Sequence, residues 1–198
     1  MGISTKKFLI VVLSLTLLFA VSCSNEDKTG GGNGDIDNQI NALFNSIPAL
    51  FSADATDAPN GTYTGDFTLT DSKNIGNYDG GSIDTPNISL DIKENKKLTL
   101  TSKNFSISFR DAPIKTDNNG KYNAISEVSS EATGILQKFS YYIEFTKDND
   151  TAIKDIKFIV VSSIKGETDG VKANGGYRET YTCKTLTSSV TFNKYYNK

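Results

Sequence analysis

The hydrophobic pattern of the chain changes its period near Gly61, and this change constrains the fold more than any other feature. After Gly61, apolar and polar residues alternate, as at Tyr63, Phe67 and Leu69 with threonines between them. A period of two places successive side chains on opposite faces of a β-strand. The same alternation recurs at residues 88–92, 98–100, 105–109, 139–145, 156–164, 177–183 and 190–192.

Turn-forming residues separate these segments, at 94–96, 117–120, 148–150, and from Asp169-Gly170 through Gly175-Gly176. Short strands joined by such turns predict antiparallel pairing. Residues 57–198 are therefore predicted to form an all-β domain, an antiparallel sandwich or barrel of about eight strands. Strand order decides between the two, so both stay open at this point. Residues 121–133 show the least clear pattern.

A helix is predicted before the strands, in a segment 35–56 that also contains the connection. Asp35 follows a glycine and suits the N-cap. Apolar residues then recur at spacings of three and four: Ile36, Ile40, Leu43, Phe44, Ile47 and Phe51. Pro48 predicts a break near Ser46-Ile47, because the residues before a proline avoid helical angles. The exposed face has no lysine, so we expect the apolar face to pack on the protein's own sheet.

Residues 1–22 have the features of a secretory signal peptide. Lys6 and Lys7 precede an apolar run of 13 residues, 8–20, which only Ser14 and Thr16 interrupt. A bilayer-spanning helix needs about 20 apolar residues, so the run is too short to be one. The pattern predicts export and cleavage.

The residues after this run resemble the lipobox of bacterial lipoproteins, with Ala20-Val21-Ser22 before Cys23. The resemblance implies that Cys23 carries diacylglycerol, that the chain is cleaved before it, and that the new amine is acylated. Secretory cleavage without lipidation is the alternative. Residues 23–34 would form a lipidated flexible tether, since 29–34 is glycine-rich. The lipid bilayer is thus one expected partner.

Two further resemblances concern the compartment and the family. Residues 24–28 resemble the acidic export signal of surface lipoproteins in Bacteroidetes, which implies an outer-membrane, surface-facing location. The lipobox, the short helix and the opening strand 61–70 together resemble small lipoproteins of gut Bacteroidetes. Some members of that group are described as calycin-like barrels. The group has no established catalytic residues, so the resemblance supplies none.

Composition excludes several functions. The chain has no histidine, which removes Ser-His and Cys-His nucleophile pairs and histidine-containing metal sites. Its formal net charge is −2, and no run of basic residues suggests a nucleic-acid face. We predict no cofactor and no metal. Cys183 falls in strand phase with Tyr181 and is expected to be a buried structural thiol.

Three residue groups are candidates for chemistry, and each has a simpler structural explanation. Glu127, Glu131 and Glu144 could supply a carboxylate pair for glycan hydrolysis, but nothing in the sequence fixes their separation, and solvent-facing strand positions are the favoured explanation. The turns 117–120 and 148–150 could supply oxygen ligands to Ca²⁺, but neither matches the EF-hand loop. Several tyrosines could form an exposed platform for sugars: Tyr141, Tyr142, Tyr177, Tyr181, Tyr195 and Tyr196. Alternation predicts that some of them face solvent.

The sequence also suggests a glycosylation site and favours a non-catalytic role. Asp150-Thr151-Ala152 resembles the O-glycosylation acceptor of Bacteroidetes, which makes Thr151 a candidate modification site. The favoured function is a non-catalytic binding or structural module, not an enzyme. A barrel that binds a small apolar ligand and a carboxylate-dependent glycan hydrolase are the alternatives. A glycan, a protein and a small apolar ligand are all possible partners, and the oligomeric state stays open.

Overall fold

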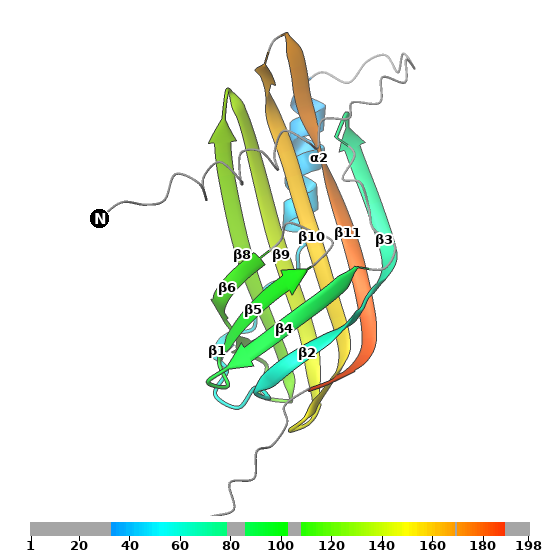
Figure 1. Ribbon diagram of the computed structural model, residues 1–198. Helices are drawn as coiled ribbons and strands as arrows, with labels where there is room; N and C mark the ends of the chain where they lie inside the picture. Colours follow the sequence, from blue (N-terminus) through cyan, green and yellow to red (C-terminus); the bar gives the residue numbers. More distant parts are fainter. Residues whose placement is uncertain (1–32, 79–85, 103–107, 169, 189–198) are drawn as a thin grey trace, which may run out of the picture. The chain divides into compact units, whose positions relative to one another are not determined.

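One helix and eleven strands make up the part of the chain that the structure describes. The structure is a computed structural model, and it describes residues 33–78, 86–102, 108–168 and 170–188 (Figure 1). Apart from the helix, these residues form antiparallel sheets of seven and four strands. The predicted all-β class with one preceding helix is confirmed.

The larger sheet consists mainly of four long or moderately long strands that follow one another in sequence. These are β8 (Lys121–Ala132), β9 (Ile135–Asn149), β10 (Ala152–Thr168) and β11 (Val171–Thr187). The sheet order is β1-β7-β8-β9-β10-β11-β3. Its outer strands are β3 (Thr68–Gly76), β1 (Ala53–Asp54) and β7 (Lys115–Thr116).

The smaller sheet packs on one face of the larger one. It contains β2 (Gly61–Asp66), β4 (Asn87–Lys93), β5 (Lys97–Ser102) and β6 (Ser108–Pro113), in the order β2-β4-β5-β6. Figure 1 shows these strands crossing the lower part of the long strands. Alternate residues of both sheets form one core, which includes Leu90, Leu100, Ile143, Phe158 and Val160.

The barrel alternative is wrong for the described strands. Neither strand order closes on itself, and the two sheets share only an isolated bridge between Tyr63 and Ser188. The strand number also exceeds the expected eight or so. The strand predicted for 62–70 divides at the buried Phe67, where the chain passes from β2 in one sheet to β3 in the other.

Helix α2 (Asn33–Asn45) covers the opposite face of the larger sheet. It begins two residues before Asp35, so the predicted N-cap is wrong. The Asp35 carboxylate instead lies in the first turn and accepts a hydrogen bond from Gln39 Nε2 at 2.8 Å. The predicted break is confirmed: the helix ends at Asn45, three residues before Pro48.

The apolar face of α2 packs on the sheet at Ile40 and Leu43. These side chains contact Ile75, Tyr142, Ile159 and Val161. Tyr142, Ile159 and Val161 alternate along β9 and β10 with the residues that face the smaller sheet, so both faces of these strands are covered here. In Figure 1 the helix lies behind the long strands and the smaller sheet lies in front of them.

Glycines within β11 allow the helix to approach. Gly175 and Gly176 were predicted to belong to a turn, but they lie inside β11, and the turn residue is Gly170, with φ +76°. A Cβ on Gly176 would lie 2.8 Å from Ser162 O, and 3.4 Å from Leu43 Cδ1. The missing side chain therefore leaves room for Leu43, which is why glycine fits a strand at this point.

Candidate functional site

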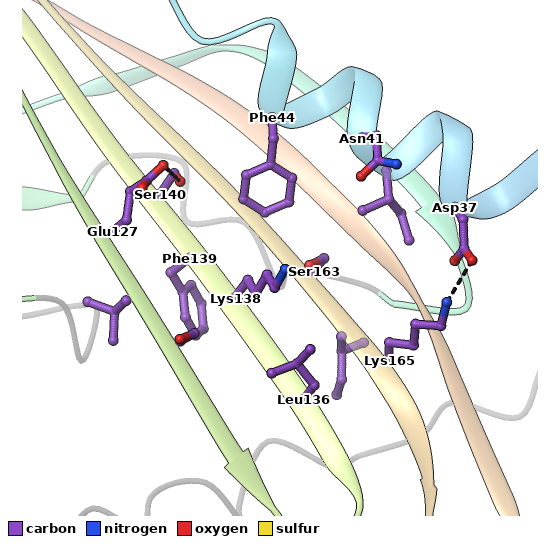
Figure 2. A pocket seen from close by; sticks show the side chains of 14 residues that line it. Asp37, Asn41, Phe44, Glu127, Leu136, Lys138, Phe139, Ser140, Ser163 and Lys165 are labelled. Atoms are coloured by element: carbon purple, nitrogen blue, oxygen red, sulfur yellow. Dashed lines mark hydrogen bonds and ion pairs between the residues drawn. The ribbon is translucent and has the colours of Figure 1, made fainter.

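A groove lies between α2 and the uncovered part of the larger sheet. The helix contacts β3, β10 and β11, and it also covers Tyr142 of β9. The same face of the distal parts of β8 and β9, around Ser129 and Lys138, has no covering element among the described residues. The groove has a volume of about 600 Å³. The side chains that point into it come from α2 (Asp37, Ile40, Asn41, Phe44), β8 (Glu127, Ser129), β9 (Leu136, Lys138, Ser140) and β10 (Ser163, Lys165) (Figure 2).

The groove has balanced charges. At one end Lys165 Nζ of β10 lies 2.6 Å from Asp37 Oδ2 of α2, an ion pair that joins the helix to the sheet. On the other wall Ser140 Oγ donates to Glu127 Oε1 at 3.2 Å. Lys138 lies on β9 between these groups, opposite Ser129 of β8.

Apolar and hydroxyl groups complete the walls. Phe44 and Leu136 face each other across the groove in Figure 2, and the hydroxyls of Ser140 and Ser163 lie at its base. Ser140 and Ser163 are buried. Such a surface can hold a ligand that presents both apolar area and hydrogen-bonding groups.

A second polar cluster fixes the chain where it leaves α2. Asn123 of β8 is fully buried, and its Nδ2 donates to Ala49 O and to the Tyr142 hydroxyl, both at 3.2 Å. Its Oδ1 accepts from the Phe51 amide at 3.1 Å. The Tyr142 hydroxyl donates to Glu144 Oε2 at 2.7 Å. Burial, and then the hydrogen bond to Glu144, raise the pKa of Tyr142, so this hydroxyl stays a donor.

The three candidate carboxylates do not converge on one point. All three glutamates lie on the groove face of the sheet. In the pairing of β8 with β9, Glu144 lies opposite Asn123, which is four residues before Glu127, and Glu131 is four residues after Glu127. Neighbouring positions in this row are four residues apart along a strand, which is about 13 Å. Glycosidase carboxyl pairs lie about 5 to 9.5 Å apart. Glu144 instead accepts the hydrogen bond from Tyr142.

The expected exposed tyrosine platform is wrong for the four described residues. Tyr141, Tyr142, Tyr177 and Tyr181 are all buried, because the smaller sheet covers one face of the strands and α2 covers the other. Tyr195 and Tyr196 lie outside the described residues. Burial raises the pKa values of Tyr141 and Tyr177 above the usual range.

The core contains a carboxylate that sequence reasoning missed. Glu179 is 1% exposed, and the Tyr181 hydroxyl donates to its Oε2 at 2.7 Å. Phe158 stacks beside Tyr181 at a ring-centroid distance of 6.1 Å. The signal was present in the sequence, because Glu179 alternates in phase with Tyr177 and Tyr181 and so had to share their face.

Cys183 is half-buried rather than fully buried. It is a free cysteine, and its Sγ lies 3.8 Å from Thr185 O. Burial raises the pKa of this thiol, so it is protonated near neutral pH. Cys23, the predicted lipidation site, lies outside the described residues.

In the turns 117–120 and 148–150 the carboxylates accept hydrogen bonds from nearby backbone amides or form ion pairs with lysines. Asp117 Oδ1 accepts from the Asn119 and Lys121 amides, at 2.8 and 3.1 Å. Asp148 pairs with Lys154 at 2.9 Å, and Asp150 with Lys147 at 3.0 Å. Within the described ranges no three His, Cys, Asp or Glu side chains are grouped so that they could hold a metal ion.

Thr151 lies exposed in the turn between β9 and β10. Its Oγ1 and its amide both donate to Asn149 Oδ1, at 3.0 and 2.8 Å. The predicted modification site is therefore on the surface, at the end of a hairpin.

Comparisons with protein-family models, with curated proteins and with solved structures found no match to this chain. Among the residues that the structure describes, no helix is both long and apolar enough to cross a bilayer.

Proposed function

We propose that this chain is a lipid-anchored lipoprotein of the bacterial outer-membrane surface that acts as a non-catalytic binding module. The observation that carries the proposal is the groove between α2 and strands β8 to β10, with its balanced charges and its mixed apolar and hydroxyl walls. Its two acidic and two basic side chains, Asp37, Glu127, Lys138 and Lys165, balance in formal charge, although only Asp37 and Lys165 form an ion pair. This balance favours a small ligand that is uncharged or zwitterionic.

The anchor is supported by the sequence before the body. An apolar run of signal-peptide length ends at Ala20, three residues before Cys23, and a glycine-rich stretch follows that cysteine. Several acyl chains on one cysteine hold a protein to a bilayer far more firmly than one chain does. Intact mass of the mature protein tests this: a mature chain that begins elsewhere than Cys23 contradicts the proposal.

The arrangement of the side chains supports a binding role over a catalytic one. The chain has no histidine, the glutamates along the groove face lie four residues apart, and the described thiol is protonated near neutral pH. The open two-sheet body, which we class as a β-sandwich, gives no support to a ligand inside a barrel. An activity screen on glycans, peptides and esters tests the role, and turnover lost in Glu127→Gln, Glu131→Gln or Glu144→Gln would overturn it.

The binding site itself is tested with matched variants. The full-length lipoprotein in detergent is screened against immobilised glycans and peptides, and each ligand found is measured again with Lys138→Ala and Phe44→Ala. Lys184→Ala and Leu50→Ala are the controls, because both residues are exposed and neither lines the groove. We expect binding to fall in the first pair alone. Ligands that bind equally to all four variants would show that the groove is not the site.

A further inference from the structure

The distal part of β8 is an unpaired sheet edge. Strand β7 pairs with β8 only at Tyr122 and Asn123, whereas β9 pairs with β8 along its whole length to Ala132. Between Ala124 and Ala132, β8 therefore has β9 as its one hydrogen-bonded strand neighbour among the described residues, although β6 of the smaller sheet also lies close to β8. Every second residue of such a strand directs its N–H and C=O away from the sheet. These groups can bond an added strand.

This edge lacks most of the features that usually prevent strand addition, and its charged side chains are two glutamates. Folded proteins protect long edges with lysine, proline or a bulge. Residues 124–132 contain no lysine and no proline, and their register with β9 has no shift. The opposite edge, β3, has both Lys73 and a register shift against β11. The two edges of the sheet thus differ, and β8 is the one that can accept a regular strand.

The side chains of this edge define the chemistry of the partner. From Glu127 to Ala132 every side chain is exposed. Glu127 and Glu131 lie on the groove face, and neither has an ion pair among the described residues. Val128 lies on the other face and is 46% exposed, which leaves one apolar side chain open to contact. The edge is acidic on the groove face, and on the other face it carries Val128 between two serines.

We propose that an extended segment of a partner protein, with basic residues four positions apart, adds to β8 as an antiparallel strand. Its basic residues lie opposite Glu127 and Glu131, and the residues between them alternate toward Val128 and toward Ser129. Opposite charges that face each other across strands stabilise the pairing. This inference rests on the proposed binding function. It identifies the class of partner that binds to β8, the strand that forms one wall of the groove.

A second copy of this chain fits the edge less well. Antiparallel self-pairing centred on Ser129 would place Glu127 of each copy opposite Glu131 of the other. Like charges in directly opposed positions destabilise a strand pair. Charge complementarity therefore favours a basic partner segment.

The experiment measures binding of synthetic peptides to the full-length lipoprotein in detergent. The probe is a fluorescent peptide with the core Lys-Val-Thr-Val-Lys flanked by threonines. One control peptide replaces both lysines with glutamate, and another carries N-methyl groups on alternate amides, which removes its strand hydrogen bonds. We expect binding of the lysine peptide alone, with hydrogen exchange slowed in residues 124–132 of the protein.

Matched variants locate the binding. Glu127→Lys combined with Glu131→Lys should weaken peptide binding by about tenfold or more, because two attractive pairs become repulsive. Val128→Lys should also weaken it, since an edge lysine disfavours strand addition. Glu94→Lys, in the β4–β5 turn of the smaller sheet, and Leu50→Lys make the same kinds of change at exposed positions outside β8 and should leave binding unchanged.

Four results would overturn strand addition: equal binding of the lysine and glutamate peptides, equal binding of the N-methylated peptide, slowed exchange outside β8, or dimers of the lipoprotein that Val128→Lys dissociates. The proposed function is tested separately. If β8 accepts no strand while ligands from the screen still depend on Lys138 and Phe44, only the partner class is wrong.

Discussion

Gly176 of β11 lies directly beneath Leu43 of α2, and the Ser162 carbonyl of β10 leaves no room there for a side chain. A Cβ at this position would lie 3.4 Å from Leu43 Cδ1 and 2.8 Å from Ser162 O. The contact fixes how close the helix comes to the sheet, and it therefore sets one wall of the groove.

We expect Gly176→Ala to destabilise the fold by about 1–3 kcal/mol, the usual cost of overpacking. Urea denaturation followed by circular dichroism measures the change. Gly34→Ala is the control, because no atom lies within 4 Å of the added Cβ and alanine favours a helix. Equal stabilities of Gly176→Ala and the unmodified protein would contradict the close packing of Ser162 O and Leu43 around this position.

Asn123 should hold the segment after α2 to the sheet. Asn123→Ala removes three hydrogen bonds, to Ala49 O, the Phe51 amide and the Tyr142 hydroxyl. The Tyr142 hydroxyl keeps its bond to Glu144, and Ala49 is exposed to water, so the Phe51 amide loses most. We expect a loss of about 1–3 kcal/mol, the cost of one polar group left unsatisfied.

Hydrogen exchange checks this prediction, because amides of residues 49–51 should exchange faster in Asn123→Ala. Asn38→Ala is the control, since Asn38 is exposed on α2. Unchanged exchange at 49–51 would show that other contacts hold this segment.

The stability of the protein should fall above pH 10. Burial, and then the hydrogen bond to Asp57, raise the pKa of Tyr122 to about 12, and burial also raises those of Tyr141, Tyr142 and Tyr177. An unfolded tyrosine ionises near pH 10. Between these values the unfolded chain binds fewer protons than the native one, so stability is complete below pH 10 and declines as the pH approaches 12.

Urea midpoints at a series of pH values, with tyrosinate absorbance, test this prediction. Tyr122→Phe should reduce the decline. Full tyrosinate absorbance at pH 10 in a protein that is still folded would contradict it.

The mature protein should contain a single titratable thiol. Lipidation converts the sulfur of Cys23 to a thioether, which leaves Cys183. Because burial raises the pKa of Cys183, its reaction with a disulfide reagent should be slow at neutral pH and should accelerate in denaturant. Two thiols per denatured chain would show that Cys23 is unmodified, and Cys183→Ser identifies which signal belongs to the body.

Thr151 should carry a glycan in the native host. Its exposure at the end of the β9–β10 hairpin makes the hydroxyl accessible once the bond to Asn149 opens. Peptide mass spectrometry of the native protein tests this, with Asp150→Ala expected to abolish the modification. Peptides that carry only unmodified Thr151 would contradict the prediction.

The elements that sequence reasoning found are those in which burial produces a pattern. Strands β4, β5, β9 and β10 alternate because one face of each packs in the core between the sheets. Helix α2 has a three-to-four spacing because one face lies on the sheet, and Pro48 marks its end. In these segments the local pattern and the tertiary packing select the same structure.

The features that were missed depend on how the elements pack together. The distal part of β8 is exposed on both faces, so its sequence shows no alternation. Tyr141 and Tyr142 are adjacent in β9, so their side chains point to opposite faces of the sheet. The sequence does not show that α2 covers the face on which Tyr142 lies. The groove exists because α2 lies over β10, β11 and β3, and no local pattern encodes where a helix lies on a sheet.

The pairing of β3 with β11 has a consequence for the order of folding. Arg178 of β11 pairs with Asp71 of β3, 107 residues earlier in the chain. Strands β8 to β11 are consecutive hairpins, whose contacts close short loops and so form quickly. Strand β3 and helix α2 are synthesised before them, but their main partners, β10 and β11, emerge near the end of the chain. Helix α2 and strand β3 therefore stay without their main partners until β11 is present, and this delay is the period in which a chaperone would be most useful.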